Sequence, residues 1–399
     1  MHLNVRLPKV EPSHIEPPSR CPLQDPKNRK KKCNGTYFKE HQWACQKPLR
    51  DTRYARVTAR RYRCLKCNRT FRVYPTGVSH LQQSDTLKGL SVLLYILGLS
   101  YQGVSDLLDT LGFFLSKTTV YQNVQGAGVQ AIHLRQQWLT DQAGHVQVLS
   151  ADFTHVKCGG QQRIVAVATA VLTGQPITFD LLATEKTLHI EQWIRQVAQM
   201  LGAEVLVTDD ADSLKTVADD LGLMHQICRA HVNRNVHTLI GELGTQVMED
   251  PDRVPWELDS TQVSWDQFAE DLSTVEGIIC GIPSNGQQEL ETLLTRYQDA
   301  PPPAQGNRAT MWYRFRRLVL DWYENWARLS LYHRWRSEHG EKLDGTNNVT
   351  EQVIGQCVKE RYRTMRGYKR DESILNVSSL IGWIRAQEPG YDMSPLITN

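Results

Sequence analysis

The stretch Ala203 to His237, AEVLVTDDADSLKTVADDLGLMHQICRAHVNRNVH, decides the fold of this chain. Val205 to Val207 is a short, apolar and mostly β-branched run, so it predicts a buried strand. Asp209 and Asp210 follow that strand. Open α/β sheets bind their ligands at the C-terminal ends of the strands. Asp209 is therefore either a solvated loop acid or a member of a site at that edge.

The residues after Asp209 favour the second interpretation. Ser213 to Leu221 has helical spacing, and His225 to Ile227 is a second short strand candidate. Cys228 and His231 then form a C-x-x-H motif. The order T-D-x-x-x-S-L followed by C-x-x-H resembles the middle catalytic block of the DDE/D transposases that carry a Cys-x-x-His signature, the mutator-like and related bacterial insertion-sequence enzymes.

That resemblance assigns roles to several acids. It implies that Asp209 is the second catalytic acid, with Asp210 and Asp212 as neighbours that could replace it, and that Cys228 and His231 give structural support. The second block reads T-D-D instead of the commoner T-D-G.

The first and third acids implied by the resemblance lie far away in the chain. Asp152 lies within the apolar run around Val148 and Phe153, where an acid faces solvent or meets a cation, because burying it unpaired is costly. Thr346-Asn347-Asn348 with Glu351 resembles the T-N-N-x-x-E block of the third acid. The same spacing also fits a helix capping box with Asn348 at the N-cap, and the two interpretations are compatible.

The remaining pattern around these acids predicts an α/β domain. Residues 145–160, 161–174 and 175–185 are three strand-like runs separated by turns that contain glycine, as in an antiparallel meander. A helix over Thr187 to Leu201 and the Val205 strand follow. This order looks like the RNase H-like fold of DDE enzymes.

Composition separates a basic N-terminal part from an acidic remainder. The chain has 399 residues and a net charge of +3, but residues 1–80 contain 19 Lys and Arg against 5 Asp and Glu. Such a split predicts a basic arm for polyanions and an acidic body suited to metal ions. No run of eighteen apolar residues and no apolar signal core occur, so we expect a cytoplasmic, nucleoid-associated protein without a membrane partner.

Five of the nine cysteines lie within the first 67 residues. In a protein of the cell interior this clustering favours zinc over disulfides. The C-x2-C pair Cys64 and Cys67 resembles the knuckle of the zinc ribbon that precedes many insertion-sequence transposases. We expect Cys21 and Cys33 to complete a structural Zn²⁺ site, with Cys45 or His41 as substitutes.

Basic and polar residues beside this ribbon predict contacts with DNA. The helical runs 84–99 and 101–111, followed by a third that opens at Ser116, form a helix-turn-helix pattern, and residues 127–139 predict a separate linking helix. A helical hairpin in an ordinary core has the same pattern. The candidate DNA-binding residues are Lys30, Lys31, Lys32, Arg60, Arg61, Arg63, Lys117, Thr118, Thr119, Gln122, Asn123, Arg361 and Arg363.

The chain thus predicts five segments. They are a basic arm and zinc ribbon (1–80), a helix-turn-helix domain (81–130), the first part of an RNase H-like catalytic domain (131–238), an all-α insertion (239–340) and the C-terminal catalytic part (341–399). Aromatic residues of the insertion, such as Trp312 and Trp335, have the helical spacing of core residues, and a minority of exposed ones would stack on flipped bases.

The resemblance implies a DNA transposase in which Asp152, Asp209 and Glu351 hold two Mg²⁺ or Mn²⁺ ions about 4 Å apart for strand cleavage and strand transfer. Its partners would be the double-stranded DNA of transposon ends and target, and a second copy of the chain at least. The alternatives are a domesticated transposase acting as a DNA-binding regulator and an RNase H-fold nuclease without strand transfer.

Overall fold

A computed structural model describes residues 4–24, 31–141, 146–249, 256–258, 261–300, 302–303, 305–306, 309–340, 342–365 and 367–398. The chain forms two compact units. The first contains Met1–Trp138, Val156–Gln162 and Gly355–Asn399, and the second contains Leu139–His155 and Arg163–Ile354. The three acids Asp152, Asp209 and Glu351 belong to the second unit, and Cys21, Cys33, Cys64 and Cys67 belong to the first.

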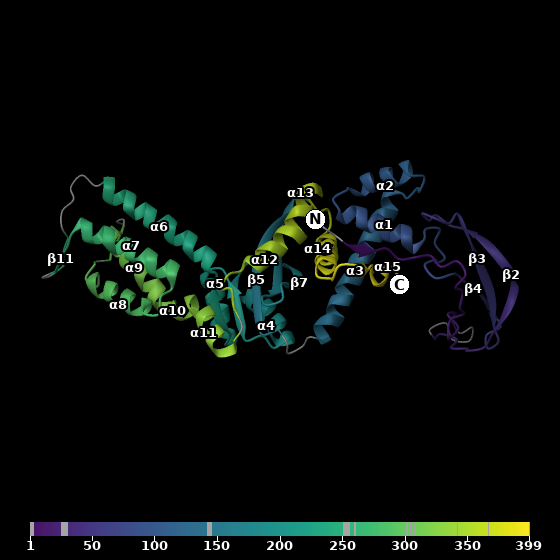
Figure 1. Ribbon diagram of the computed structural model, residues 1–399, viewed down its shortest axis with the longest axis horizontal. Coiled ribbons are helices and arrows are strands. Elements are labelled where there is room, and N and C mark those ends of the chain that lie inside the picture. Colours follow the sequence, from purple (N-terminus) through teal and green to yellow (C-terminus); the bar gives the residue numbers. More distant parts are fainter. Residues whose placement is uncertain are drawn as a thin grey trace. The chain divides into compact units, whose positions relative to one another are not determined.

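The second unit is built on a five-stranded sheet with the order β7-β6-β5-β8-β9 (Figure 1). Gly159 and Gly160 join β5 (Val148–Cys158) to β6 (Gln161–Ala170), and both have positive φ, 57° and 84°, as a two-residue hairpin of type I′ requires. β7 (Gln175–Leu182) is antiparallel to β6. β8 (Val205–Thr208) is parallel to β5, and β9 (Met224–Ile227) is parallel to β8. The predicted α/β arrangement is confirmed as a mixed sheet.

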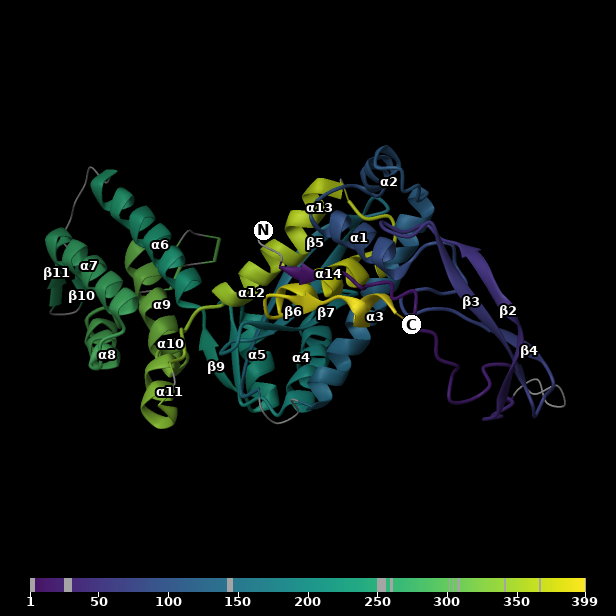
Figure 2. The same cartoon turned by 45° about the vertical axis from the view of Figure 1, so that its right-hand side comes forward.

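Two crossover helices link the parallel strands. α4 (Thr187–Leu201) leads into β8, and α5 (Asp212–Leu221) leads from β8 to β9. Each ends at a glycine in the left-handed region, Gly202 with φ 70° and Gly222 with φ 66°, where a side chain would be strained. The two helices pack side by side next to the sheet (Figures 1 and 2).

A buried histidine fixes the end of β8 from the neighbouring strand. Arg328 Nη1 lies 3.0 Å from His225 Nδ1, so this ring nitrogen must be the acceptor and Nε2 carries the proton toward Thr208 Oγ1 at 2.8 Å. Burial and the Arg328 charge lower the pKa of His225 to about 3. Thr208 Oγ1 donates in turn to the carbonyl oxygen of Asp209 at 2.9 Å. The neutral imidazole therefore helps to fix the backbone that carries a candidate acid.

The insertion is mostly helical, and its aromatic residues form its core. Phe268, Tyr297, Trp312 and Phe315 pack against one another at centroid distances of 4.6 to 6.4 Å. Trp335 is fully buried and packs with Val148, Val205 and Val207 of the sheet. The elements are α6 (Arg229–Glu249), β10 (Trp256–Leu258), β11 (Thr261–Val263), α7 (Trp265–Gly281), α8 (Gly286–Arg296), α9 (Met311–Glu324), α10 (Trp326–Leu329) and α11 (Leu331–His339).

The first unit begins with a small antiparallel sheet of three strands. Its strands are β2 (Phe38–Pro48), β3 (Arg56–Cys64) and β4 (Thr70–Val73), in that order. The turn between β3 and β4 contains the C-x2-C pair. Elsewhere in this unit, β1 (Val5–Arg6) pairs in parallel with β12 (Tyr391–Asp392).

Three helices follow this sheet, but they differ in one respect from the prediction. α1 (Asp85–Ile96) and α2 (Tyr101–Thr110) start at the serine caps Ser84 and Ser100. α3 (Lys117–Asp141) continues without a break, so residues 127–139 are helical as predicted but belong to the same helix that opens after Ser116. Glycine lets α3 approach α14 (Asp371–Arg385) closely, since a Cβ on Gly128 would lie 2.5 Å from the carbonyl oxygen of Asn376. The last helix is α15 (Ser394–Ile397).

The helix that carries Glu351 is not a regular α-helix. α12 (Asn348–Val353) passes into a π-helical segment, Ile354–Lys359, and then into α13 (Glu360–Met365). Its N-cap is Asn347, whose side chain makes no capping hydrogen bond. The capping box expected at Asn348 and Glu351 is therefore absent from this helix.

Candidate active site and cysteine cluster

Adjacent strands of the second unit carry Asp152 and Asp209. β5 and β8 pair in parallel with Ser150 opposite Val207, so Asp152 and Asp209 both lie two residues beyond this pair. Both side chains are half-buried. The Asp152 carboxylate accepts the backbone N–H of Phe153 at 2.7 Å, and the Asp209 carboxylate accepts that of Ala211 at 3.3 Å. Parallel pairing thus places two acids from distant parts of the sequence at the same level of the sheet, Asp152 within β5 and Asp209 just after β8.

Hydroxyl groups fix the helix of the third acid against the sheet. Thr350, next to Glu351, is fully buried. Its hydroxyl donates to Ser150 Oγ at 2.7 Å and lies 2.6 Å from Thr169 Oγ1. Ser150 is on β5, two residues before Asp152 and on the same face of that strand. The sequence pattern did not identify Ser150, Thr169 or Thr350, because an isolated hydroxyl in a strand or helix has no distinctive spacing.

The charges of Asp209 and Glu351 act on the carboxyl group of Asp152. Burial raises the pKa of Asp152, the Phe153 N–H and the Asn347 amide oppose this shift, and the charges of Asp209 and Glu351 add to it. The carboxylates are nevertheless not gathered into a tight cluster. In the described part of the chain, a group of three or more metal-ligating atoms within 4.8 Å of one another occurs at the cysteines and not at these acids.

Cys228 and His231 connect the second acidic block to the third. Cys228 is fully buried, and its sulfur accepts the backbone N–H of Asn347 at 3.3 Å. Burial alone would raise the pKa of Cys228, but the His231 ring and the N–H groups of Asn347 and His231 lower it. His231 Nε2 lies 3.4 Å from Glu351 Oε1. Contact with Cys228 and the nearby Glu351 and Asp209 charges raise the pKa of His231.

Asn347 also belongs to the candidate active site. From the sequence it was identified only as a member of the T-N-N motif. Its side chain is fully buried, and neither its amide nitrogen nor its amide oxygen has a hydrogen-bond partner. The amide lies close enough to Asp152 to lower the pKa of that carboxyl, but not in hydrogen-bond geometry. Buried amide groups in proteins normally have a hydrogen-bond partner, and the Asn347 amide is an exception.

The alternative acids are engaged elsewhere. Lys215 Nζ lies 2.8 Å from Asp210 Oδ1 and 3.3 Å from Asp212 Oδ1. The Asp212 side chain is 96% exposed. These contacts make Asp209 the better candidate of the three.

In the first unit, the thiols of Cys21, Cys33, Cys64 and Cys67 lie together, all within 4.8 Å of one another. Two of the separations are 3.9 Å, between Cys21 and Cys67, and 3.8 Å, between Cys33 and Cys64. Four sulfurs bound tetrahedrally at about 2.3 Å from one zinc ion would lie about 3.8 Å apart. The cluster therefore has the composition and spacing of a closed structural zinc site.

The surroundings of these thiols shift their pKa values in opposite directions. Burial would raise the pKa of Cys64, but the N–H groups of Cys67 and Lys66 lower it to about 7. Burial raises the pKa of Cys21 to about 12 and also raises that of Cys33. Gly35 makes room for the cluster, since a Cβ there would lie 2.6 Å from Cys64 Sγ. The proposed substitutes are not members, because Cys45 is exposed on β2 and His41 Nε2 lies beside Arg63 at 3.1 Å.

Two of the candidate DNA-binding residues, Asn123 and Arg361, are buried, which corrects the expectation that they face DNA. Asn123 is 3% exposed and is held by Gln83 and Ser91, so it cannot reach a base. Arg361 is 3% exposed, and its guanidinium lies 3.9 Å from the Tyr95 ring centroid. Both are polar residues on helices, where sequence alone does not reveal the inward face.

The other candidates lie at or near the surface, apart from one outside the described residues. Thr119 is half-buried, and its hydroxyl lies 2.9 Å from that of Ser116. Arg61 and Arg63 are also half-buried. Lys30 falls outside the described residues. The exposed candidates are Lys31, Lys32, Arg60, Lys117, Thr118, Gln122 and Arg363.

Comparison with known proteins gives only remote likenesses. No protein-family model matches the sequence, and no curated protein matches it. Among solved structures, the Drosophila P element transposase strand transfer complex is similar over 78% of this chain and 93% of its own, with 10% identity and a TM-score of 0.37.

Two isolated catalytic domains give lower scores. The HTLV-2 integrase catalytic core with magnesium is similar over 32% of this chain and 82% of its own, with 14% identity and a TM-score of 0.19. The Mos1 transposase catalytic domain is similar over 51% and 92%, with 10% identity and a TM-score of 0.19. These values are too low to carry a conclusion about this chain. Separately, none of its described helices has the length and apolarity needed to cross a bilayer.

Proposed function

We propose that this protein is a DNA transposase with an RNase H-like catalytic domain, in which Asp152, Asp209 and Glu351 are the catalytic acids. The observation that carries the proposal is the parallel register of β5 and β8, which sets Asp152 and Asp209 at one level, together with the Thr350–Ser150 hydrogen bond that fixes the helix of Glu351 on β5. Carboxylates that repel one another inside a protein are typical of sites that bind cations or transfer protons.

The donor set suits a hard divalent cation, Mg²⁺ or Mn²⁺. Asp152, Asp209 and Glu351 offer carboxylate oxygens, the ligands that such ions prefer. Asn347 adds a buried amide without a partner beside Asp152, which fits a site that is completed by a further polar group. When bound, such ions activate the attacking oxygen and stabilise the leaving oxygen of a phosphodiester.

The protein's own residues would orient these ligands. Thr350 and Ser150 fix α12 on β5, so they would set the position of Glu351 relative to Asp152. His231 would orient the Glu351 carboxylate, which it approaches at 3.4 Å. Cys228 would support both, because its sulfur accepts the N–H that precedes α12. Positioning residues of this kind typically matter about 10–100-fold at metal sites.

The first unit would bind the DNA. The cysteine cluster would hold Zn²⁺ and stabilise the small sheet whose arginines flank the knuckle. Exposed cations such as Arg60 and Lys117 suit phosphate groups, so the affinity for DNA should fall steeply as salt rises. Bringing two transposon ends together would require at least two copies of the chain.

The test is incubation of the protein with Mg²⁺ and DNA that carries the element's own ends. We expect Asp152→Asn, Asp209→Asn and Glu351→Gln to bind this DNA as the wild type does. We expect each to nick it more than about 100-fold more slowly, since loss of a ligand should exceed the cost of losing an outer partner. Asp212→Asn is the matched control, because Asp212 is an exposed acid of the same block.

The reaction products distinguish a transposase from a nuclease and from a DNA-binding regulator. Nicking that persists in one of the three variants would remove that residue from the site. Nicking without joining of the freed 3′ end to target DNA would indicate a nuclease. Specific binding without any cleavage would indicate a DNA-binding regulator.

A further inference from the structure

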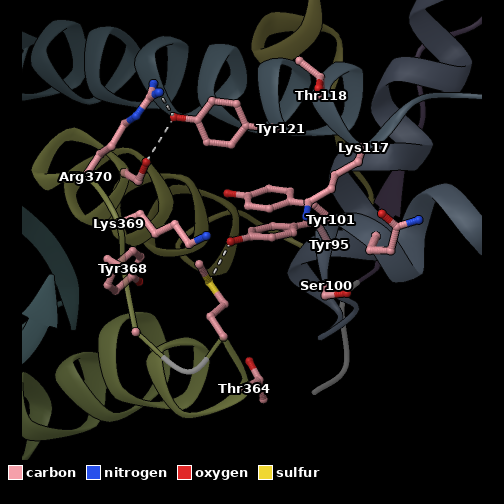
Figure 3. Close-up of a pocket in the computed structure, with 14 residues that line it drawn as sticks. Tyr95, Ser100, Tyr101, Lys117, Thr118, Tyr121, Thr364, Tyr368, Lys369 and Arg370 are labelled. Carbon is pink, nitrogen blue, oxygen red and sulfur yellow. Dashed lines mark hydrogen bonds between the residues drawn. The ribbon is translucent and has the colours of Figure 1, made fainter. Parts of the chain in front are cut away.

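A cavity of about 530 Å³ opens in the first unit, and none of the three acids lines it. It lies between the start of α3, the stacked tyrosines of α1 and α2, and the link from α13 to α14 (Figure 3). Its volume falls within the range of about 300–1,000 Å³ that is usual for small-molecule sites. The lining residues used below are Tyr95, Tyr101, Lys117, Tyr121, Lys369 and Arg370.

Aromatic rings form the body of this cavity. Tyr95 and Tyr101 stack with centroids 4.4 Å apart, and Tyr121 meets Tyr101 edge to face at 5.3 Å. The other face of Tyr95 is covered by Arg361. The tyrosines are therefore held rigidly, and a ligand ring that entered would meet walls that need no reorganisation.

Polar groups converge on one side of the rings. Figure 3 shows the hydroxyl ends of Tyr95, Tyr101 and Tyr121 pointing toward the side where Lys369 and Arg370 lie. Arg370 Nη1 donates to Tyr121 Oη at 3.4 Å, and Tyr95 Oη lies 2.8 Å from Met365 Sδ. Burial raises the pKa of both Tyr95 and Tyr101, so these hydroxyls stay protonated and remain donors.

The charge of the cavity is entirely of one sign. Lys117, Lys369 and Arg370 are cationic and exposed, and none of the fourteen lining residues is acidic. Lys117 and Tyr121 lie in the first turns of α3, where unpaired N–H groups of a long helix also favour an anion. Cationic side chains beside aromatic walls suit a ligand that has a flat ring and a phosphate.

We propose that this cavity binds a nucleoside phosphate, with its base against the half-buried rings of Tyr101 and Tyr121 and its phosphate on Lys369 and Arg370, on the side to which the tyrosine hydroxyls point. The chemistry is the same for a free nucleotide and for one unpaired nucleotide of a DNA strand. A plain anion site would not need the tyrosine walls, and a neutral ring site would not need the two cations. The inference does not depend on the proposed function, since none of the three acids lines the cavity.

The experiment measures binding to the full-length protein without added Mg²⁺, so that no cleavage is involved. Calorimetry compares deoxyadenosine monophosphate with inorganic phosphate and with deoxyadenosine. A second arm follows the fluorescence of 2-aminopurine placed as a single unpaired base in a duplex, against the same base in a fully paired duplex. The variant is Lys369→Gln, and the control is Lys9→Gln, which removes the same charge from an exposed residue outside the cavity.

We expect the nucleotide to bind more tightly than phosphate or deoxyadenosine. Lys369→Gln should weaken the nucleotide about tenfold, the usual loss for one hydrogen bond to a charged group, and Lys9→Gln should leave it unchanged. Tyr101→Phe keeps the rings and tests the hydroxyl donor in a protein that remains folded. Preference for the duplex with the unpaired base would assign the site to DNA, and binding of the free nucleotide alone would assign it to a soluble ligand.

Two results would overturn the proposal. Inorganic phosphate that binds as tightly as the nucleotide would show that the rings take no part. Equal effects of Lys369→Gln and Lys9→Gln would show that the response is only a general effect of net charge. Failure of DNA cleavage in the assay of the proposed function would leave this result untouched.

Discussion

The backbone N–H of Asn347 donates to the sulfur of Cys228 at 3.3 Å, although the two residues lie in different blocks of the sequence. This contact joins the turn after β9 to the residue before α12, the helix that carries Glu351. Because the sulfur is fully buried, water cannot replace it as the acceptor. Cys228 is thus explained as a structural acceptor that holds the start of the third acidic block.

Replacing Cys228 should test this role. Cys228→Ala leaves the buried N–H of Asn347 without an acceptor, so we expect it to lower the free energy of unfolding by about 1–3 kcal/mol. Cys228→Ser keeps an acceptor of smaller size and should lose less. Urea titration followed by circular dichroism measures both. Equal stability of the alanine variant and the wild type would contradict the role.

Asp152→Asn should make the folded protein more stable at neutral pH while it abolishes nicking. Burial raises the pKa of Asp152, and the charges of Asp209 and Glu351 add to the shift, so the charged form is disfavoured in the folded state. A neutral amide removes this repulsion. Differential scanning calorimetry without divalent cations should show a higher melting temperature. Asp212→Asn, at a 96% exposed side chain, should not change it.

Stability should fall in mild acid because of His225. Its pKa is lowered to about 3 in the folded protein, whereas an unfolded histidine titrates near about 6.5. The unfolded chain therefore binds one more proton between these values, and stability declines as pH falls below about 6.5, by at most about 1.4 kcal/mol per pH unit.

His225→Gln removes the titrating group, so it should flatten this part of the pH profile even if it lowers stability overall. Urea midpoints at several pH values between 4 and 8 would measure the slope. His80→Gln is the control, since His80 is exposed. An unchanged slope in His225→Gln would assign the acid sensitivity to other groups.

Bound zinc should be essential for the three-stranded sheet. Only the cysteines of the cluster should be needed to hold it. Cys64→Ser removes one of the four clustered thiols, so we expect loss of one bound zinc per chain and of the ordered sheet. Cys45→Ser changes an exposed thiol of the same sheet outside the cluster and should have no effect. Elemental analysis and proteolysis of the N-terminal part measure these outcomes. Full zinc content in Cys64→Ser would exclude that ligand.

The sequence predicted best what depends on local pattern. α4 occupies the predicted range Thr187–Leu201, because its apolar spacing is regular and Gly202 ends it in a conformation that glycine adopts easily. The strands β8 and β9 were also found where β-branched and apolar runs predicted them. Two glycines predicted the β5–β6 turn for the same local reason.

The parts that depend on tertiary contacts were missed. Asn123 and Arg361 are polar residues on helices, yet both face inward, because partners that are distant in sequence satisfy them. The π-helical segment after α12 gives no pattern of its own, since it differs from an α-helix only in its hydrogen bonding. The unpartnered amide of Asn347 is likewise a property of the folded site and not of the T-N-N motif.

The hydroxyl contacts of Thr350 limit how the third acid can be displaced. Ser150 and Thr169 present oxygens at one level of the sheet, and Thr350 meets both. If α12 slid by one residue, either the apolar side chain of Val349 would face those oxygens, or Glu351 itself would turn away from the site to meet them. The helix that carries Glu351 can therefore occupy only discrete positions along the sheet. Ligand binding would change the side-chain rotamer of Glu351 before it moved the helix.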